Sequence, residues 1–263
     1  MSAPLTVRIL GCGSSGGVPR LGANGADWGA CDPANPRNKR TRCSILVSRG
    51  EARVLVDASP DMREQLIAAR CGKLDGVLFT HDHADQCHGV DDLRMVAQAM
   101  GKRVDIHADA MTMAGLKRRF GYCFETPEGN GYPPIITGHE IAPLRAFEIA
   151  GVPVLPFDQD HGTMRTLGFR FGPVAYTSDA VAIPEASFAA LSGIECWIVD
   201  ALRYRPHPTH ANVEMALSWI QRVRPNRAIL TNLHADLDFV RLARELPEGV
   251  EPAYDGLEIS LIG

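Results

Sequence analysis

The segment that most restricts the fold of this chain is GVLFTHDHAD, at residues 76–85. Its first four residues have the pattern of a short buried strand. His81, His83 and Asp85 follow that strand at alternating positions. A single histidine in a loop is usually a surface or capping residue, but three ligand-type side chains in one tight turn leave that turn few purposes other than metal binding. The segment therefore predicts a metal-binding loop at the carboxyl end of a buried strand.

The rest of the chain alternates strand patterns with helix patterns. Apolar runs typical of strands lie at residues 5–10, 44–47, 53–57, 103–107, 152–157, 168–171, 174–179, 194–201 and 227–234. Helical patterns begin near residue 59 and lie at residues 90–100, 183–191, 211–223 and 237–246. From residue 118 to residue 140 the chain loses this periodicity, which predicts a long loop. The alternation predicts an α/β fold, and because no linker or low-complexity tract interrupts it, we expect residues 1–263 to form a single domain.

Composition and charge narrow the class of protein. Hydrophobic residues make up 45% of the chain and charged residues 22%, and the net charge of −4 gives no electrostatic case for nucleic-acid or membrane partners. The N-terminal residues lack the basic start and apolar run of a signal peptide. The seven cysteines are scattered without a Cys-x-x-Cys pair, which argues against a disulfide framework and against a cysteine-rich zinc site at Cys31 or Cys43. We therefore expect a cytoplasmic protein with neither a membrane nor a stable nucleic-acid partner.

Ligand-type side chains also recur where other predicted strands end, at Asp57, His161, Asp179, Asp200 and His234. An acidic residue at the end of a strand often only caps the following helix, so each of these residues taken alone has a simpler explanation. Open α/β sheets, however, place their binding sites at the carboxyl ends of the strands. We therefore expect these side chains to gather with the histidine loop in one site.

At these residues the chain resembles a known superfamily. THDHAD matches the His-x-His-x-Asp-His signature of the metallo-β-lactamase fold hydrolases at every position but the last. The chain is similar above all to their phosphodiesterase branch, which contains the phosphoribosyl cyclic phosphate phosphodiesterases and, more distantly, ribonuclease Z. The segments that carry this similarity are LGCGSSGGVPR, RTRCS, VDASPDMREQ, HGVDDLR and PTHANVEMAL. The resemblance spans essentially the whole chain and implies a four-layer αββα sandwich of two mixed sheets flanked by helices.

The resemblance implies a site for two divalent metal ions, Zn²⁺ or Mn²⁺. The ligands that it assigns are His81, His83 and His161 for the first ion, Asp85 and His234 for the second, and Asp179 as the bridge. Asp57 would orient the histidine loop through hydrogen bonds. Imidazole and carboxylate ligands do not decide between the two metals.

Gln86 departs from the family pattern, because it stands where the signature has its last histidine. A glutamine offers only a neutral amide oxygen, which is a weaker ligand for zinc than imidazole. We therefore expect the second ion to bind more weakly, to be a harder ion such as Mn²⁺, or to occupy its site only in part. His88, two residues further on, is a less favoured substitute ligand.

The resemblance also implies a hydrolytic mechanism. Two ions would lower the pKa of a bridging water to give a hydroxide, and they would hold the phosphate oxygens of an in-line displacement. His210, in PTHANV, is the candidate proton donor to the leaving oxygen, with Asp200 raising its pKa. These two residues and the ligand Asp85 form the expected catalytic set. The alternative is that His210 only caps the helix predicted from residue 211.

The expected function is that of a metal-dependent hydrolase, a phosphodiesterase for a small cyclic phosphate or a nucleotide-like phosphodiester. Two alternatives stay open: an ester or thioester hydrolase on the same metal site, and a non-catalytic nucleotide- or phosphate-binding protein with a degenerate second metal site. The expected partner is the small-molecule substrate, and a homodimer is possible. Lesser candidates for substrate contact are Ser14, Ser15, Arg42, Arg94, His207, Tyr122 and Phe124, whereas His88, His107 and His139 are expected to be structural.

Overall fold

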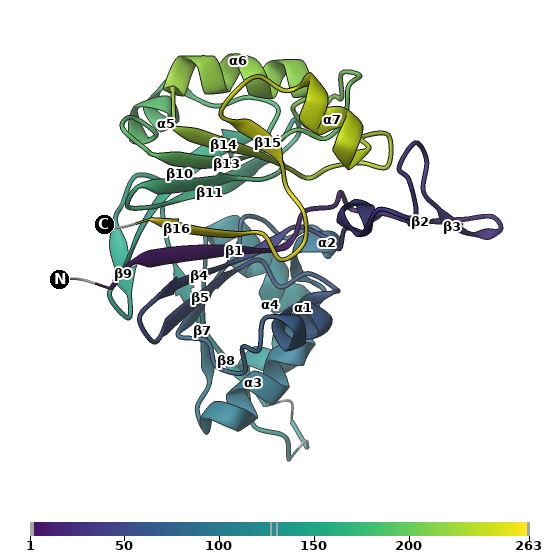
Figure 1. The fold of residues 1–263 in the computed structure, drawn as a ribbon. Coiled ribbons are helices and arrows are strands. Elements are labelled where there is room, and N and C mark those ends of the chain that lie inside the picture. The colour runs from purple at the N-terminus through teal and green to yellow at the C-terminus, as the bar shows by residue number, and fades with distance from the viewer. Residues whose placement is uncertain (1–2, 127, 130, 262–263) are drawn as a thin grey trace.

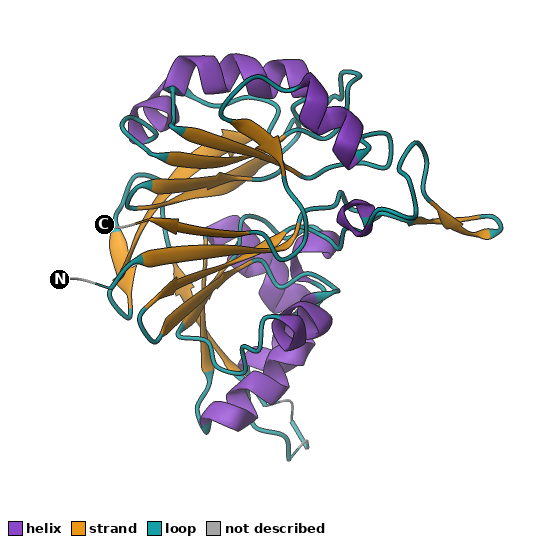
Figure 2. Cartoon of the chain, in the orientation of Figure 1, coloured by secondary structure: helices purple, strands orange, loops and turns teal. Residues whose placement is uncertain are grey.

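Two β-sheets lie face to face between two layers of helices in the computed structural model (Figure 1). The structure describes residues 3–126, 128–129 and 131–261. Helices cover the outer face of each sheet, and strands fill the middle of the molecule (Figure 2). The four-layer αββα sandwich predicted from the sequence is therefore confirmed.

The first sheet has seven strands in the order β16-β1-β4-β5-β6-β7-β8. Their bounds are Leu5–Gly11 for β1, Ser44–Arg49 for β4, Ala52–Val56 for β5, Gly76–Leu78 for β6, Val104–Ala108 for β7, Ile136–Glu140 for β8 and Glu258–Leu261 for β16. The helices of this half are η1 (Pro36–Asn38), α1 (Met62–Ala68), α2 (Ala84–Cys87), η2 (Val90–Asp92), α3 (Leu93–Met100) and α4 (Ala110–Phe124). Strands β5 to β8 are parallel and the others antiparallel, so the sheet is mixed.

The second sheet also has seven strands, in the order β15-β14-β13-β12-β11-β10-β9. Their bounds are Phe147–Ile149 for β9, Val152–Asp160 for β10, Arg165–Phe171 for β11, Val174–Thr177 for β12, Cys196–Asp200 for β13, Arg227–Thr231 for β14 and Val250–Pro252 for β15. The helices are α5 (Glu185–Ala190), α6 (Val213–Val223) and α7 (Phe239–Glu245). Strands β12 to β15 are parallel, and β9 to β12 are antiparallel.

The core between the sheets follows from the two-residue period of the strands. In β4, Ile45 and Val47 face the second sheet, whereas Leu46 between them packs into the layer beneath the helices. Phe169 and Ile198 reach the same central core from the second sheet. Apolar residues on both faces of a strand explain why these strands read as nearly continuous hydrophobic runs.

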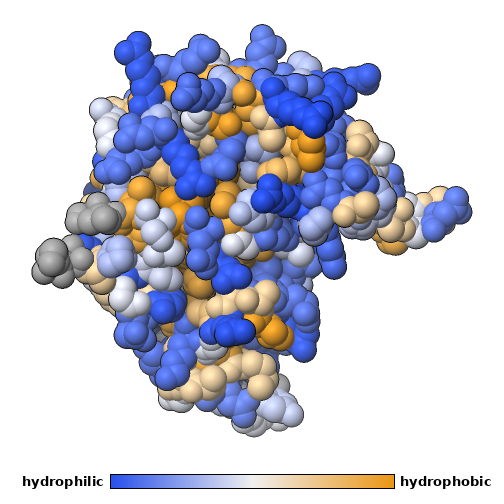
Figure 3. All heavy atoms as spheres, viewed as in Figure 1, coloured by the Kyte–Doolittle hydropathy of each residue, from blue (hydrophilic) through white to orange (hydrophobic). Residues whose placement is uncertain are grey.

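A short hairpin leaves the body of the molecule near the site described below. Strands β2 (Arg20–Gly22) and β3 (Gly25–Asp27) form it, and it projects away from both sheets (Figure 1). Leu21 on this hairpin is 95% exposed. Hydrophilic side chains cover most of the face drawn in Figure 3, on which the hairpin also stands clear of the body.

The prediction of a long loop from residue 118 to residue 140 is wrong at both ends. Helix α4 continues to Phe124, and β8 begins at Ile136. The side chain of Asp109 accepts a hydrogen bond from the backbone of Thr112 and so starts the helix. Tyr122 and Phe124, expected in the loop, therefore lie in the last turn of α4.

The sequence of α4 shows only a weak helical periodicity. The helix contains glycines, which weaken helix propensity, and its backbone departs from helical geometry at Phe120. Buried residues such as Leu116 hold it against the first sheet all the same. Tertiary packing here outweighs a weak local signal.

Candidate metal site

The carboxyl ends of strands from both sheets meet at one edge of the sandwich. In the first sheet, Asp57 follows β5 and His81 follows β6, and these two strands are parallel. In the second sheet, β10 and β12 run in the same direction because both are antiparallel to β11. His161 after β10 and Asp179 after β12 therefore lie at the same end of that sheet.

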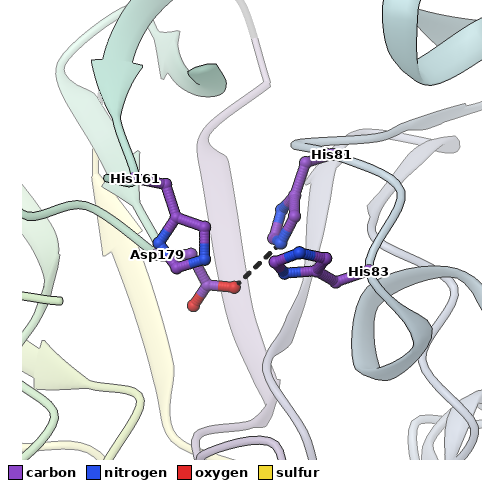
Figure 4. Close-up of side chains that lie close together, drawn as sticks. All are labelled: His81, His83, His161 and Asp179. Carbon is purple, nitrogen blue, oxygen red and sulfur yellow. Dashed lines mark ion pairs between the residues drawn. The ribbon is translucent and has the colours of Figure 1, made fainter. Parts of the chain in front are cut away.

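Four predicted ligands come together there in what we call the histidine–aspartate cluster, which consists of His81, His83, His161 and Asp179. Each offers one ligand atom, and these atoms all lie within 4.8 Å of one another. The two histidines of the first loop face His161 and Asp179 of the second sheet across the site (Figure 4). Three of the four side chains are buried, and the exposed His83 connects the cluster to solvent.

The surroundings of His81 prepare one of its nitrogens for a metal. The hydroxyl of Thr80 lies 3.0 Å from one carboxylate oxygen of Asp57 and 2.9 Å from Nδ1 of His81. Burial raises the pKa of Asp57 to about 8, and when this carboxyl is ionised the hydroxyl donates to it and accepts from Nδ1 of His81. Nε2 then carries the lone pair. This atom is buried without a hydrogen-bond partner, although Oδ2 of Asp179 lies 3.2 Å away, which is the arrangement of two ligands of one ion. Asp57 orients the histidine through Thr80.

His161 is prepared in a similar way. Its Nδ1 donates to the backbone carbonyl of Thr209 at 2.7 Å, which leaves the lone pair on Nε2. Burial lowers the pKa of His161 to about 4 in spite of the opposing charge of Asp179. The imidazole is therefore neutral at pH 7, the form that binds metal.

Asp179 is held in its ionised form. Burial by itself would raise its pKa, but the neighbouring His81 and two further histidines hold the pKa of this carboxyl well below its usual range. Nδ2 of Asn232 donates to Oδ1 of Asp179 at 2.5 Å. Three imidazoles and one carboxylate form a donor set that suits a divalent ion such as Zn²⁺ or Mn²⁺. The cluster therefore fits one divalent metal ion.

Three residues of the site have left-handed backbone conformations. The φ angles are 63° at Asp57, 54° at Asp179 and 63° at Asn232. Aspartate and asparagine tolerate this region better than other residues with a side chain, and such conformations are frequent at functional sites. The strand ends thus turn sharply and direct their side chains into the site.

His210 and Asp200 form a pair beside the cluster. Nδ1 of His210 lies 3.1 Å from Oδ2 of Asp200 and 3.6 Å from Oδ1 of Asp179. The rings of His210 and His161 are 4.7 Å apart between centroids. Burial lowers the pKa of His210, but the hydrogen bond and charge of Asp200 outweigh burial and raise this pKa to about 9. A protonated imidazole next to a metal site can act as a general acid.

Two predicted ligands of the second ion are placed outside the cluster. Oδ2 of Asp85 lies 3.3 Å from Nε2 of Gln86, which lies at the same distance from Oδ2 of Asp179. Burial, with the nearby Asp179, raises the pKa of Asp85. Nε2 of His234 lies 2.9 Å from Nη1 of Arg20, and its Nδ1 lies 2.7 Å from a carboxylate oxygen of Asp236. Among the described residues, neither Asp85 nor His234 belongs to a group of three or more clustered ligand atoms.

Four residues of the site are not predicted from the sequence: Arg20, Thr80, Thr209 and Asn232. Thr80 and Asn232 stand one and two residues before the predicted ligands His81 and His234, and this proximity is the signal that was available. Arg20 ends the glycine-rich turn after the first strand, and nothing local in the sequence indicates its contact with a histidine 214 residues away.

The lesser candidates divide into those near the site and those far from it. Arg42 and Ser15 line a pocket of about 650 Å³ together with Arg20. The ring of His207 lies 5.0 Å from that of His210 between centroids. Arg94 instead pairs with Asp91, and Tyr122 and Phe124 end α4. His107 and His139 stack on each other on β7 and β8, and His88 packs against Phe120. Ser14 is buried at the glycine-rich turn.

Comparison with known proteins identifies the family and the fold of the chain. A family model described as "Beta-lactamase superfamily domain" matches residues 52–232. A diphosphatase of the PhnP family has a crystal structure with a TM-score of 0.90 and 33% identity, over 99% of this chain and 98% of that one. Zn²⁺-bound PqqB from Methylobacterium extorquens, at 20% identity and a TM-score of 0.75 over 97% of this chain and 100% of that one, shares the fold. No described helix has the length and hydrophobicity needed to cross a membrane.

The curated relatives include a protein of Porphyromonas gingivalis named octanoyltransferase. It is 32% identical over 256 residues, which are 95% of this chain, and the chain spans only half of the relative's length. The family model matches more than half of the chain, and the similarity to the PhnP-family diphosphatase extends over nearly all of it. The chain therefore belongs to the β-lactamase superfamily, as a metallo-β-lactamase fold hydrolase of the phosphodiesterase branch.

Proposed function

We propose that this protein is a metal-dependent phosphodiesterase that hydrolyses a small cyclic phosphate or a nucleotide-like phosphodiester. The observation that carries the proposal is the His210–Asp200 pair, which lies against a cluster able to hold a divalent metal. Phosphodiester hydrolysis needs both an electrophilic centre for the phosphate and a proton for the leaving alkoxide. An ester or thioester hydrolase has less need of a strongly basic imidazole that stays protonated at neutral pH.

The histidine–aspartate cluster would hold the metal. A divalent ion bound there supplies Lewis acidity, which favours the ionised form of water and stabilises negative charge on phosphate oxygens. The protein's own contribution is to fix the direction of the His81 and His161 imidazoles through Thr80 and Thr209.

His210 is the proton donor in this proposal. Its Nδ1 donates to Asp200, so Nε2 carries the proton that passes to the leaving oxygen. Oδ2 of Asp200 also accepts from the backbone of Ala180 at 3.0 Å, which fixes the carboxylate. Asp200 acts through His210 and is a positioning residue.

Positive charge next to the site favours an anionic substrate. Arg20 and Arg42 both line the pocket of about 650 Å³ that also contains Ser15. Arg20 reaches His234 at the edge of the site, and Arg42 pairs with Asp61 at 3.2 Å. Guanidinium groups match phosphate oxygens well. We therefore expect the phosphate-bearing end of the substrate to extend toward these two arginines.

A diphosphate substrate is the second candidate, because the relative with 33% identity is a diphosphatase. A phosphoanhydride has a better leaving group than an alkyl phosphodiester, so its hydrolysis depends less on a proton donor. The effect of replacing His210 therefore separates the two candidates.

The test compares bis(p-nitrophenyl) phosphate, a cyclic nucleotide, a nucleoside diphosphate derivative and a thioester, each with and without Zn²⁺ or Mn²⁺. We expect metal-dependent turnover of a phosphodiester, a large loss in His83→Ala and a loss in His210→Ala without loss of metal. His139→Ala, on the exposed face of β8, is the matched control and should behave like the native chain. Turnover of the thioester alone, or of no substrate by metal-loaded protein, would contradict the proposal.

A further inference from the structure

The ligands expected for a second metal ion are already engaged by other side chains. Besides the bridging Asp179, they are Asp85, His234 and the residue at position 86. Each of these positions has a contact in the structure that competes with metal binding. The contacts come from two sources, the amide of Gln86 and the guanidinium of Arg20.

The first source is Gln86, which is 1% exposed. Its Nε2 lies 3.3 Å from Oδ2 of Asp85 and 3.3 Å from Oδ2 of Asp179. An amide nitrogen has two protons to donate and no lone pair to offer, so it satisfies both carboxylates where an ion between them would otherwise do so. The amide nitrogen thus lies between the two carboxylates as a neutral donor, while Oε1 of Gln86 is buried without a hydrogen-bond partner among the described residues.

The second source is Arg20. The carboxylate of Asp236 lies 2.7 Å from Nδ1 of His234, so Nδ1 donates and the lone pair of the ring is on Nε2. That lone pair is the one a metal would use, and Nη1 of Arg20 lies 2.9 Å from it. Nη2 of the same guanidinium lies 2.6 Å from Asp27 on the hairpin, which fixes its position.

Charge adds to this competition. A guanidinium cannot lose its proton, so a divalent ion at Nε2 of His234 would sit beside a permanent positive charge. In the histidine–aspartate cluster, by contrast, no guanidinium contacts a ligand nitrogen, and Nε2 of His81 has no hydrogen-bond partner among the described residues and faces Asp179. The histidine–aspartate cluster can therefore accept a metal ion, whereas the ligands expected for the second ion are already engaged by Gln86 and Arg20.

We propose that this protein binds a single metal ion, at the histidine–aspartate cluster, and that the Gln86 amide and the Arg20 guanidinium occupy the place of a second. The residues present do not fit the two-ion site that the family signature implies. The number of ions bound does not depend on which bond the protein hydrolyses, so this proposal can fail or hold independently of the proposed function.

The experiment counts metal. Native protein is stripped with a chelator, reloaded with excess Zn²⁺ or Mn²⁺, desalted and measured by mass spectrometry for metal per chain. We expect about one equivalent in the native chain, little in His83→Ala, and about two in the double variant Gln86→His, Arg20→Ala. With Mn²⁺, the native chain should show the electron paramagnetic resonance of an isolated ion, and the double variant should show spin coupling between two ions.

His139→Ala, which removes an imidazole far from the site, is the matched control and should keep the native count. About two tightly held equivalents in the native chain, or a coupled Mn²⁺ spectrum from it, would overturn the proposal. So would a full equivalent retained by His83→Ala, because the ion would then lie elsewhere. Circular dichroism checks the fold of the double variant, and the counts for the native chain and for His83→Ala decide the question even if that variant does not fold.

Discussion

Oδ2 of Asp200 accepts a hydrogen bond from Nδ1 of His210 at 3.1 Å, while Oδ1 of the same buried carboxylate has no partner among the described residues. One oxygen therefore carries the whole connection to the imidazole. The charge of that carboxylate raises the pKa of His210 to about 9 against the opposite effect of burial. The pair therefore keeps a protonated imidazole next to the histidine–aspartate cluster at neutral pH.

Replacing Asp200 by Asn should move the alkaline limit of activity to lower pH. The amide oxygen can keep the hydrogen bonds to His210 and Ala180, and only the negative charge is lost. Without that charge the pKa of His210 falls, so the proton is lost earlier as pH rises. The pH profile of kcat measures this, with a loss of about 10-fold to 100-fold expected at pH 8. An unshifted profile with uniformly lower activity would show that Asp200 only maintains the local structure.

Replacing Thr80 by Val should weaken metal binding. The hydroxyl of Thr80 connects Asp57 to Nδ1 of His81, and valine has the same shape without a donor or acceptor. Loss of such an outer contact typically costs about 10-fold to 100-fold in metal affinity. Competition titration with a fluorescent chelator measures the affinity. Thr80→Ser keeps the hydroxyl and is the control, so an equal loss in both variants would contradict the role of the hydroxyl.

The contrast between His81 and Arg20 shows how much of this site can be predicted from sequence. His81, His83 and Asp85 stand out because a strand end and a ligand motif are both local patterns, and the family signature adds the more distant ligands. The contact of Arg20 with His234 joins segments 214 residues apart, and no pattern in either segment specifies it. The left-handed backbone at Asn232 is also set by tertiary structure, because asparagine only tolerates that conformation and does not require it.

The helices and strands likewise divide into those that the sequence predicts and those that it does not. The period of two in strands such as β4 and the apolar periodicity of α6 are strong, and both elements are found where the sequence predicts them. Helix α4 is missed because its periodicity is weak, and it forms where its buried side chains pack on the first sheet. Sequence periodicity predicts the elements with a clear face, and packing determines the others.

Replacing Arg20 by Ala should weaken the binding of a phosphate substrate. Arg20 lines the pocket beside His234 and offers a cation to an anionic ligand. We expect KM to rise roughly 10-fold with a smaller change in kcat, because the lost contact binds substrate and transition state alike. Arg94→Ala, whose partner Asp91 lies outside the site, is the matched control. An unchanged KM for Arg20→Ala would place the substrate phosphate elsewhere.

Replacing Asp255 by Asn should change how stability depends on pH. The carboxylate accepts from the backbone and hydroxyl of Thr41, both at 2.7 Å, and from the backbone of Cys12 at 3.1 Å. Burial raises the pKa of Asp255 to about 6 despite these hydrogen bonds, from an ordinary value of 3.8. The folded state therefore binds the proton more tightly than the unfolded state. The stabilisation from this proton is complete below pH 3.8 and is lost as pH rises through about 6.

Asparagine has no such titration, and its amide nitrogen cannot accept the hydrogen bonds that one carboxylate oxygen accepts. The variant should therefore be less stable than the native chain at pH 4, and the difference should shrink toward pH 7. We expect the difference in stability to shrink by on the order of 2 kcal/mol. This is less than the full pKa shift would give, because Asp255 is partly exposed and solvent screens its charge. Urea denaturation at a series of pH values measures this difference. A gap that stays constant or widens with pH would mean that the folded state does not raise the pKa of Asp255.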